Sequence, residues 1–150
     1  LSLVFTVLGF TACHGAPHQQ NTVDLCTQTV RDYAVLRDVG PAEAYADLFV
    51  PDGTFQLGST VTVGRAALAA RHQSENKAAL WRHNMTDIRI TPTDGGAAGV
   101  SRFIIYTGSH PAPAASARRI IGDYVDTFAV EGGMCKIKSR KVQIMFDTPT

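Results

Sequence analysis

Two residues of this sequence, Asp38 and His83, have side chains suited to acid–base chemistry and lie where apolar residues are expected. Asp38 follows Ala34 by four residues and Val30 by eight, so helical spacing places all three on one face. His83 lies on the apolar side of the strand-like segment 80–90. A carboxylate bonded to one imidazole nitrogen orients the ring, raises its basicity and leaves the other nitrogen free to take a proton. Such a pair requires neither a metal nor a cofactor.

Each residue also has a structural explanation. Asp38 is placed to accept amide hydrogens in the turn "DVGP", and a lone inward histidine is commonly bonded to a backbone carbonyl. The apolar positions shift from Trp81 to Ile88, which predicts a bulge near Thr86 that would re-aim a side chain. Spacing along the chain does not show that the two residues meet, so both explanations stay open.

The elements that must position these residues follow from periodicity. Helical spacing covers Val23 to Asp38, and Pro41 is expected as the first residue of a second helix capped by Gly40. "VPDG" reads as a turn, "TFQLGSTVTVG" as a hairpin turning near Gly58, and "RAALAARHQSENKAA" as a third helix. Four long strands are predicted at 82–91, 99–108, 119–130 and 135–146. This order predicts an α+β fold in which helices, alone or together with a small-molecule cavity, fill the concave side of a curved sheet.

Composition narrows the classes of function. The 150 residues suggest one domain, and 45% apolar with 18% charged residues is typical of a globular chain. The net charge of +1 gives no electrostatic case for a nucleic-acid partner. The basic cluster Lys136 to Lys141 alternates like one face of a strand, which favours a solvated sheet surface.

The N-terminal stretch "LSLVFTVLGFTAC" resembles the apolar part of a secretory signal, with cleavage expected near Ala12 or Ala16. "FTAC" also resembles a bacterial lipobox, so Cys13 is a candidate for lipidation and membrane attachment. Residues 1–16 are therefore expected to be a signal, 17–21 a linker and 22–147 the domain, exported from the cytoplasm. Cys26 and Cys135 either pair or are two buried apolar residues, and neither has metal-ligand spacing.

The chain resembles the SnoaL-like group of the nuclear-transport-factor-2-like superfamily through several weak motifs. These are "YAVLRDVGPAEAYADLFVPDGTF", Gly64, "RHNMTDIRI" and "GDYVDTF", which together span roughly residues 22 to 146. The resemblance implies an α+β cone: a strongly curved, mixed or antiparallel sheet around a central pocket closed by N-terminal helices. It also implies a homo-oligomer and a small apolar or aromatic ligand.

Scytalone dehydratase and hexachlorocyclohexane dehydrochlorinase look closest in their chemical residues. Their His–Asp dyad maps onto His83 as general base and Asp38 as its partner, with no cofactor and no metal, in a lyase or isomerase. Arg140 is a loose counterpart of a late-strand arginine, the pocket lysine has no counterpart, and Arg37 is expected to point elsewhere. Aromatic residues expected as pocket walls, or else as plain core, are Tyr33, Trp81, Tyr106, Tyr124 and Phe128. The alternative is a non-catalytic protein that binds a small molecule in the same pocket.

Overall fold

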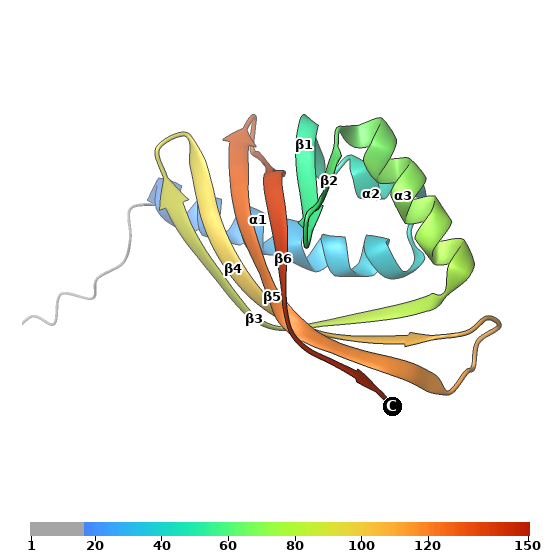
Figure 1. The fold of residues 1–150 in the computed structure, drawn as a ribbon. Helices are drawn as coiled ribbons and strands as arrows, with labels where there is room; N and C mark the ends of the chain where they lie inside the picture. Colours follow the sequence, from blue (N-terminus) through green and yellow to red (C-terminus); the bar gives the residue numbers. More distant parts are fainter. Residues whose placement is uncertain (1–16) are drawn as a thin grey trace, which may run out of the picture.

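Three helices and six strands make up the computed structural model, which describes residues 17–150 (Figure 1). The helices are α1 (Pro17–Val39), α2 (Ala42–Ala46) and α3 (Arg65–Ala78). The strands are β1 (Phe49–Leu57), β2 (Thr60–Val63), β3 (Leu80–Thr93), β4 (Gly96–Gly108), β5 (Ser116–Glu131) and β6 (Met134–Pro149). The predicted hairpin, third helix and four long strands are all present; three of the long strands extend beyond both predicted ends, and β4 begins earlier than predicted and ends at Gly108 as predicted.

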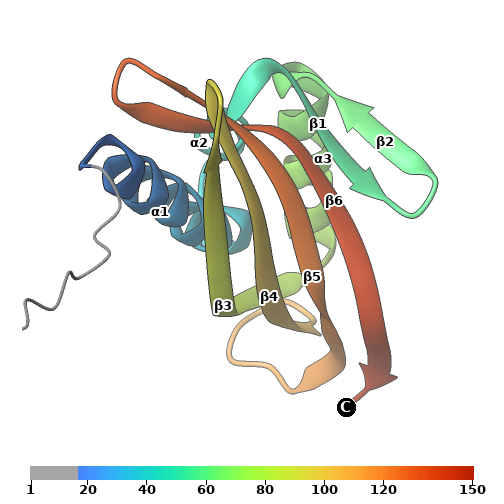
Figure 2. The ribbon, with the colours of Figure 1, turned by 90° about the vertical axis from the view of Figure 1, so that its left-hand side faces the viewer.

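One sheet organises the molecule, with strand order β2-β1-β6-β5-β4-β3. Strands β1 and β6 pair in parallel and all other neighbours are antiparallel, so the sheet is mixed. The long strands curve strongly without closing into a barrel, and α1 crosses their concave side while α3 lies near β1 and β2 (Figures 1 and 2). The predicted α+β architecture, a curved sheet with helices on its concave side, is confirmed.

Some predicted boundaries are wrong. Helix α1 begins at Pro17, so residues 17–21 start a helix instead of forming a linker; proline suits a first turn because its missing N–H would have no partner there. Pro41 is the N-cap of α2 and not its first residue. "VPDG" lies within β1, where the pairing with β6 shifts between Phe49 and Thr54. The expected signal and Cys13 lie outside the described residues.

The curvature of the sheet arises at irregular positions in its ladders. The register of β3 against β4 shifts between Met85 and Asp87, which confirms the predicted bulge. A second shift lies at Gly122, where an added Cβ would be 2.2 Å from the Gln143 carbonyl oxygen and 2.8 Å from Phe103. Only glycine fits this close approach, and such bends let a sheet wrap around its contents.

A disulfide joins the helical layer to the sheet. Cys26 on α1 bonds Cys135 at the start of β6, and both are buried. The hydroxyl of Thr29 donates to the Cys135 carbonyl at 2.8 Å, one helical turn from the disulfide. Of the two explanations left open for these cysteines, pairing is therefore the one that the fold realises.

Removing this disulfide is expected to destabilise the protein substantially. The two cysteines are 109 positions apart, and a bridge of that length restricts the unfolded chain enough to contribute about 2–4 kcal/mol. The double variant Cys26→Ala/Cys135→Ala should lose this amount of unfolding free energy in urea titrations. Reductant should lower the stability of the parent chain and leave that of the variant unchanged; equal sensitivity of both to reductant would contradict the prediction.

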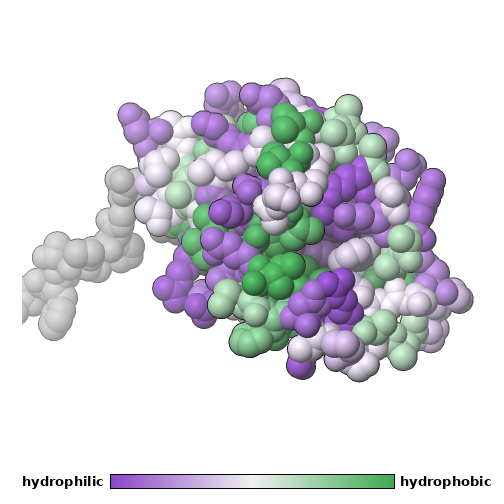
Figure 3. Space-filling view, viewed as in Figure 1, coloured by the Kyte–Doolittle hydropathy of each residue, from purple (hydrophilic) through white to green (hydrophobic). Residues whose placement is uncertain are grey.

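Apolar side chains remain on the surface near the end of β6. Ile144, Met145 and Phe146 are 43%, 64% and 62% exposed, and Figure 3 shows apolar surface running down the middle of the face that β6 crosses. The ladder pairs Ile144 with Gly122 and Phe146 with Ile121, so Ile144 and Phe146 lie on opposite faces of the sheet.

Among the described residues, no helix combines the length and apolar character needed to cross a membrane.

Candidate active site between helix α1 and the sheet

The last turn of α1 brings Asp38 against the first residues of β3. The Asp38 Oδ1 atom lies 2.6 Å from Nδ1 of the His83 ring, and the backbone N–H of His83 donates to Oδ2 at 2.9 Å. Only 2% of the Asp38 side chain and 3% of the His83 side chain are exposed. One carboxylate therefore accepts from both the backbone and the ring of the same residue, which fixes the orientation of that ring. Both of these partners of the Asp38 carboxylate lie on β3, and not in the turn "DVGP".

The hydrogen bond also determines the protonation of the ring. Because a carboxylate only accepts, Nδ1 of His83 is the N–H donor and Nε2 carries the lone pair. Burial lowers the pKa of His83 below its ordinary value of 6.5, although the hydrogen bond and charge of Asp38 act in the opposite direction. At neutral pH the ring is therefore neutral and able to take a proton at Nε2.

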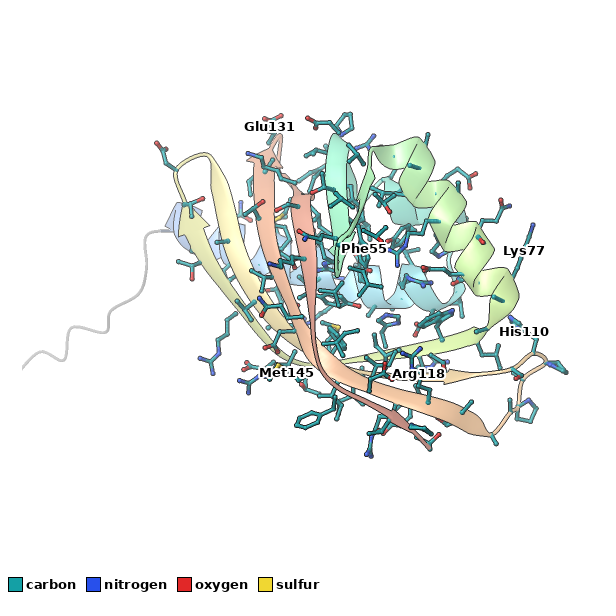
Figure 4. The ribbon with its side chains drawn as sticks, in the orientation of Figure 1. Phe55, Lys77, His110, Arg118, Glu131 and Met145 are labelled. Carbon is teal, nitrogen blue, oxygen red and sulfur yellow. A yellow bond between two sulfur atoms is a disulfide. The ribbon has the colours of Figure 1, made fainter. Side chains whose placement is uncertain are left out.

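His83 lines a cavity of about 130 Å³ between the helices and the sheet. The buried residues at its floor include Tyr33, Phe103 and Tyr124, whereas Leu57 and Ile144 are exposed and form part of its rim. Figure 4 shows two lining residues, Phe55 on β1 and Arg118 on β5, with the interior side chains between them. The complete lining consists of Tyr33, Arg37, Phe55, Leu57, Arg71, Glu75, Trp81, His83, Phe103, Ile105, Arg118, Ile120, Tyr124, Val142 and Ile144.

Three of the five aromatic residues predicted as pocket walls line this cavity. Tyr33, Trp81 and Tyr124 line the cavity, and the Tyr33 ring meets the His83 ring edge-on at 6.3 Å between centroids. Burial raises the pKa of Tyr124 well above its ordinary value, so its hydroxyl stays protonated and able to donate. Tyr106 and Phe128 do not line this cavity. Tyr106 is 37% exposed and borders a separate shallow hollow, and Phe128 is a core residue packed near Gly99.

Arg140 is also absent from the cavity wall. It is fully buried and forms two hydrogen bonds to Asp126, at 2.8 and 2.7 Å. Its guanidinium lies 3.8 Å from the Tyr33 ring centroid and 4.2 Å from that of Tyr124. Arg140 therefore supports the two tyrosines from behind by cation–π contact, and it does not reach the space where a ligand would lie.

The cavity also has a charged wall, which the sequence alone does not predict. Arg37, expected to point elsewhere, is 4% exposed and lines the cavity with its guanidinium 4.7 Å from the Trp81 ring centroid. It lies four residues after Tyr33 on α1, so the two share a face. Arg71 and Glu75 reach the cavity from α3. Their spacing of four residues signals an ion pair on a helix, but that signal alone is typical of a solvent-exposed face.

Side chains of α3 also fix the end of α1. The Asn76 amide donates to the carbonyls of Arg37 and Asp38 at 3.1 and 3.4 Å, and its oxygen accepts from Arg37. The His72 Nε2 atom is 2.9 Å from the Leu36 carbonyl. The Asn76 contacts satisfy two carbonyls that a helix leaves unpaired at its C-terminus, and the Leu36 carbonyl also accepts the Gly40 N–H. Side chains of α3 therefore hold the turn that carries Asp38.

Acid is expected to destabilise the fold through its buried histidines. Burial lowers the pKa of both His72 and His83 below 6.5. Below pH 6.5 the unfolded chain therefore binds more protons than the folded one, so stability falls with decreasing pH until the folded-state pKa values are passed. Urea titrations between pH 8 and 5 should show a roughly constant unfolding free energy above about pH 6.5 and a decline below it. The His72→Gln variant should decline less steeply, and a pH-independent parent protein would contradict this assignment.

Within residues 17–150, no three His, Cys, Asp or Glu side chains are grouped so that they could hold a metal ion. The chemistry available to this site from the described residues is proton transfer at His83, with hydroxyl and guanidinium donors around it.

Solved structures share this fold at low sequence identity. A scytalone dehydratase-like protein from Novosphingobium aromaticivorans superposes with a TM-score of 0.74 at 20% identity, over 85% of this chain and 86% of that one. A type 2 hexachlorocyclohexane dehydrochlorinase (LinA) superposes with a TM-score of 0.73 at 13% identity, over 85% and 87%. A Mycobacterium tuberculosis protein of unknown function gives a TM-score of 0.73 at 21% identity, over 82% and 71%.

No curated protein sequence matches the chain. The SnoaL-like domain family does match, over residues 21–141. This range runs from the second turn of α1 into β6 and includes both Asp38 and His83. The match covers most of the chain, and the cone-shaped fold agrees with it. The chain therefore belongs to the SnoaL-like family.

Proposed function

We propose that this protein is a cofactor-independent lyase or isomerase that acts on a small molecule, with His83 as general base and Asp38 as its orienting partner. The observation that carries this proposal is the 2.6 Å contact between Asp38 Oδ1 and His83 Nδ1, beside a cavity that the His83 ring lines. The contact directs the unprotonated Nε2 away from Asp38, so that this nitrogen is the one available to a substrate.

The reaction begins with transfer of a C–H proton from the substrate to Nε2 of His83. The electron pair left on carbon then moves toward a neighbouring carbonyl, or expels a leaving group from the adjacent carbon. Asp38 stabilises the imidazolium that forms, because its carboxylate already bonds Nδ1–H. The protonated hydroxyl of Tyr124 is a suitable donor to the oxygen that gains charge.

The relatives support this class of reaction. Dehydratase and dehydrochlorinase activities, named for two of the proteins that share the fold, are both eliminations, in which a proton and a leaving group depart from adjacent carbons. Fold similarity alone does not determine function, so the local geometry at His83 is the stronger support.

Proton exchange tests the proposal without knowledge of the true substrate. The protein is incubated in D₂O with a panel of small cyclic ketones and halogenated or hydroxylated cyclic compounds, and ¹H NMR follows exchange or elimination. The expected result is deuterium incorporation or product formation that requires His83. Exchange by the parent chain and by His83→Gln at the same rate would overturn the assignment of the base.

A non-catalytic binding protein is the second candidate, and one contact favours it. Asp38 also accepts the backbone N–H of His83, so the buried carboxylate has a structural role that needs no catalysis. This candidate predicts a ligand retained through purification, visible by native mass spectrometry, and no exchange with any member of the panel.

We also propose that the protein is exported, as the N-terminal sequence suggests. The buried disulfide supports this proposal because disulfides persist in oxidising compartments and are rare in the cytosol. Cell fractionation of the native source tests it: recovery of the protein only from the cytosolic fraction, with both cysteines reduced, would contradict export.

A further inference from the structure

One wall of the cavity carries an excess of positive charge that the proposed proton transfer does not use. Glu75 bonds two arginines: its Oε2 lies 2.5 Å from Nη2 of Arg37, and its Oε1 lies 2.8 Å from Nη2 of Arg71. Both oxygens of the carboxylate are thus engaged, and two guanidinium groups share one negative charge. All three residues line the cavity. We call Arg37, Glu75 and Arg71 the arginine triad; its net charge is +1.

The other charged groups near the cavity do not cancel this charge. Arg118 at the rim is paired with Asp147. Arg140 is paired with Asp126 behind the tyrosines, away from the cavity. Asp38 is not among the residues that line the cavity, and the Arg82 guanidinium lies 4.0 Å from its carboxylate. The triad is therefore the unneutralised charge that a ligand would contact.

The triad is held in place on flat aromatic surfaces. The Arg37 guanidinium lies 4.7 Å from the Trp81 ring centroid, and that of Arg71 lies 3.9 Å from the Phe55 ring centroid. Arg37 also donates to Asn76. A guanidinium fixed by stacking and by a carboxylate loses little freedom when it binds another anion, and its planar donors suit carboxylate oxygens.

The volume of the cavity limits the size of the ligand. At about 130 Å³ it is close to the roughly 150 Å³ of an apolar cavity that holds benzene in another protein. The rings of Phe55, Trp81 and Phe103 line it, so its walls fit a flat, single-ring molecule. Such a ligand would contact aromatic surface and the triad together.

We propose that this site binds a single-ring monoanion, with the ring in the aromatic cavity and its carboxylate on the arginine triad. This inference deepens the proposed function, because it names the substrate class of the same site, but binding itself does not require His83. Proton transfer to Nε2 of His83 leaves negative charge on the substrate, first at the carbon and then at the neighbouring carbonyl oxygen or the leaving group. The positive triad stabilises that charge.

The sole tryptophan of the chain makes the test specific. Trp81 is the only tryptophan and lies against both Arg37 and His83, so its fluorescence reports on this cavity. Benzoate, neutral benzamide and cationic benzamidinium have nearly the same shape and differ in charge. We expect benzoate to bind roughly 10-fold or more tightly than benzamide, and benzamidinium not to bind. Equal affinity for benzoate and benzamide would overturn the proposal.

Two opposite variants distinguish a charge effect from a structural one. Arg71→Met keeps a side chain over Phe55 but makes the triad neutral, and should weaken benzoate binding by roughly 10-fold or more. Glu75→Gln raises the charge of the triad to +2 and should strengthen binding. Arg102→Met, at an exposed arginine paired with Asp123, is the matched control and should change nothing. A loss of benzoate affinity in both Arg71→Met and Glu75→Gln would mean that the triad only supports α3, which overturns the proposal.

The His83→Gln variant separates this inference from the proposed function. If it binds benzoate like the parent chain, the binding site stands whether or not any turnover is found. Circular dichroism and thermal unfolding of each variant establish that it is folded before its affinity is interpreted. If Arg71→Met is unfolded, Arg71→Lys replaces it: this variant keeps the charge but loses the planar donors, and unchanged benzoate affinity in it would contradict the role given to the guanidinium.

Discussion

Replacing His83 with alanine is expected to lower kcat/KM by about 10²–10⁴-fold for any substrate that the protein turns over, because positioned general bases contribute by this factor. His83 is the imidazole among the residues that line the cavity, and its Nδ1 is held by Asp38. Steady-state kinetics measure the effect. The Arg102→Met variant is the control for a nonspecific loss of activity, since Arg102 is exposed and has no role in the proposed reaction. Near-parental turnover in His83→Ala would show that His83 is not the general base.

A substitution of Asp38 is a second test of the His83–Asp38 pair. Asp38→Asn removes the carboxylate that orients the ring, so it should also lower kcat/KM strongly. Because the two residues act together, the double variant His83→Ala/Asp38→Asn should be little worse than His83→Ala alone. Fully additive losses would mean that Asp38 affects turnover through some path other than His83.

The largest expected loss of stability comes from breaking the buried ion pair of Asp126 and Arg140. Both side chains are at most 1% exposed, and two hydrogen bonds join them. Asp126→Asn would leave a guanidinium in the core without a counter-charge, which typically costs about 3–5 kcal/mol. Urea unfolding monitored by circular dichroism measures this cost.

Two further variants make the result interpretable. Asp123→Asn lies three residues earlier on β5, where the ion pair with Arg102 is partly exposed and 3.7 Å long, and should cost less than about 1 kcal/mol. Replacing both charges, as Asp126→Leu/Arg140→Met, should recover much of the stability, because apolar pairs of similar volume often substitute well for buried ion pairs. A double variant as unstable as Asp126→Asn would show that the cation–π contacts of Arg140, and not its charge balance, dominate.

Local periodicity was sufficient to predict most of the secondary structure. The hairpin around Gly58 and the bulge after Met85 have signals within a few residues, and both are present. "VPDG" is an irregular stretch of β1 between two parallel pairs with β6, Phe49 with Ile137 and Thr54 with Ser139, so only a partner about 88 positions away places it inside a strand. No short window contains that information, so the segment reads as a turn.

The residues of the candidate site also differ in whether local sequence signals reveal them. Asp38 and His83 stood out because a polar residue on an apolar face is conspicuous in sequence. Arg71 and Glu75 did not, because charged residues on a helix are usually solvated, and only the packing of α3 over the cavity reveals their position. Tyr106 lies outside the cavity, and aromatic character does not tell which face of a strand a side chain occupies.

The two bonds that Asp38 accepts from one residue have a consequence for interpreting related sequences. Its carboxylate fastens the backbone of β3 as well as the imidazole ring, so a descendant that lost its chemistry would still need the aspartate to dock that strand. Inactive relatives would then retain the aspartate for its structural role, while the histidine could be substituted. Activity in such relatives should therefore be assigned from the presence of the histidine that corresponds to His83, and not from that of the aspartate that corresponds to Asp38.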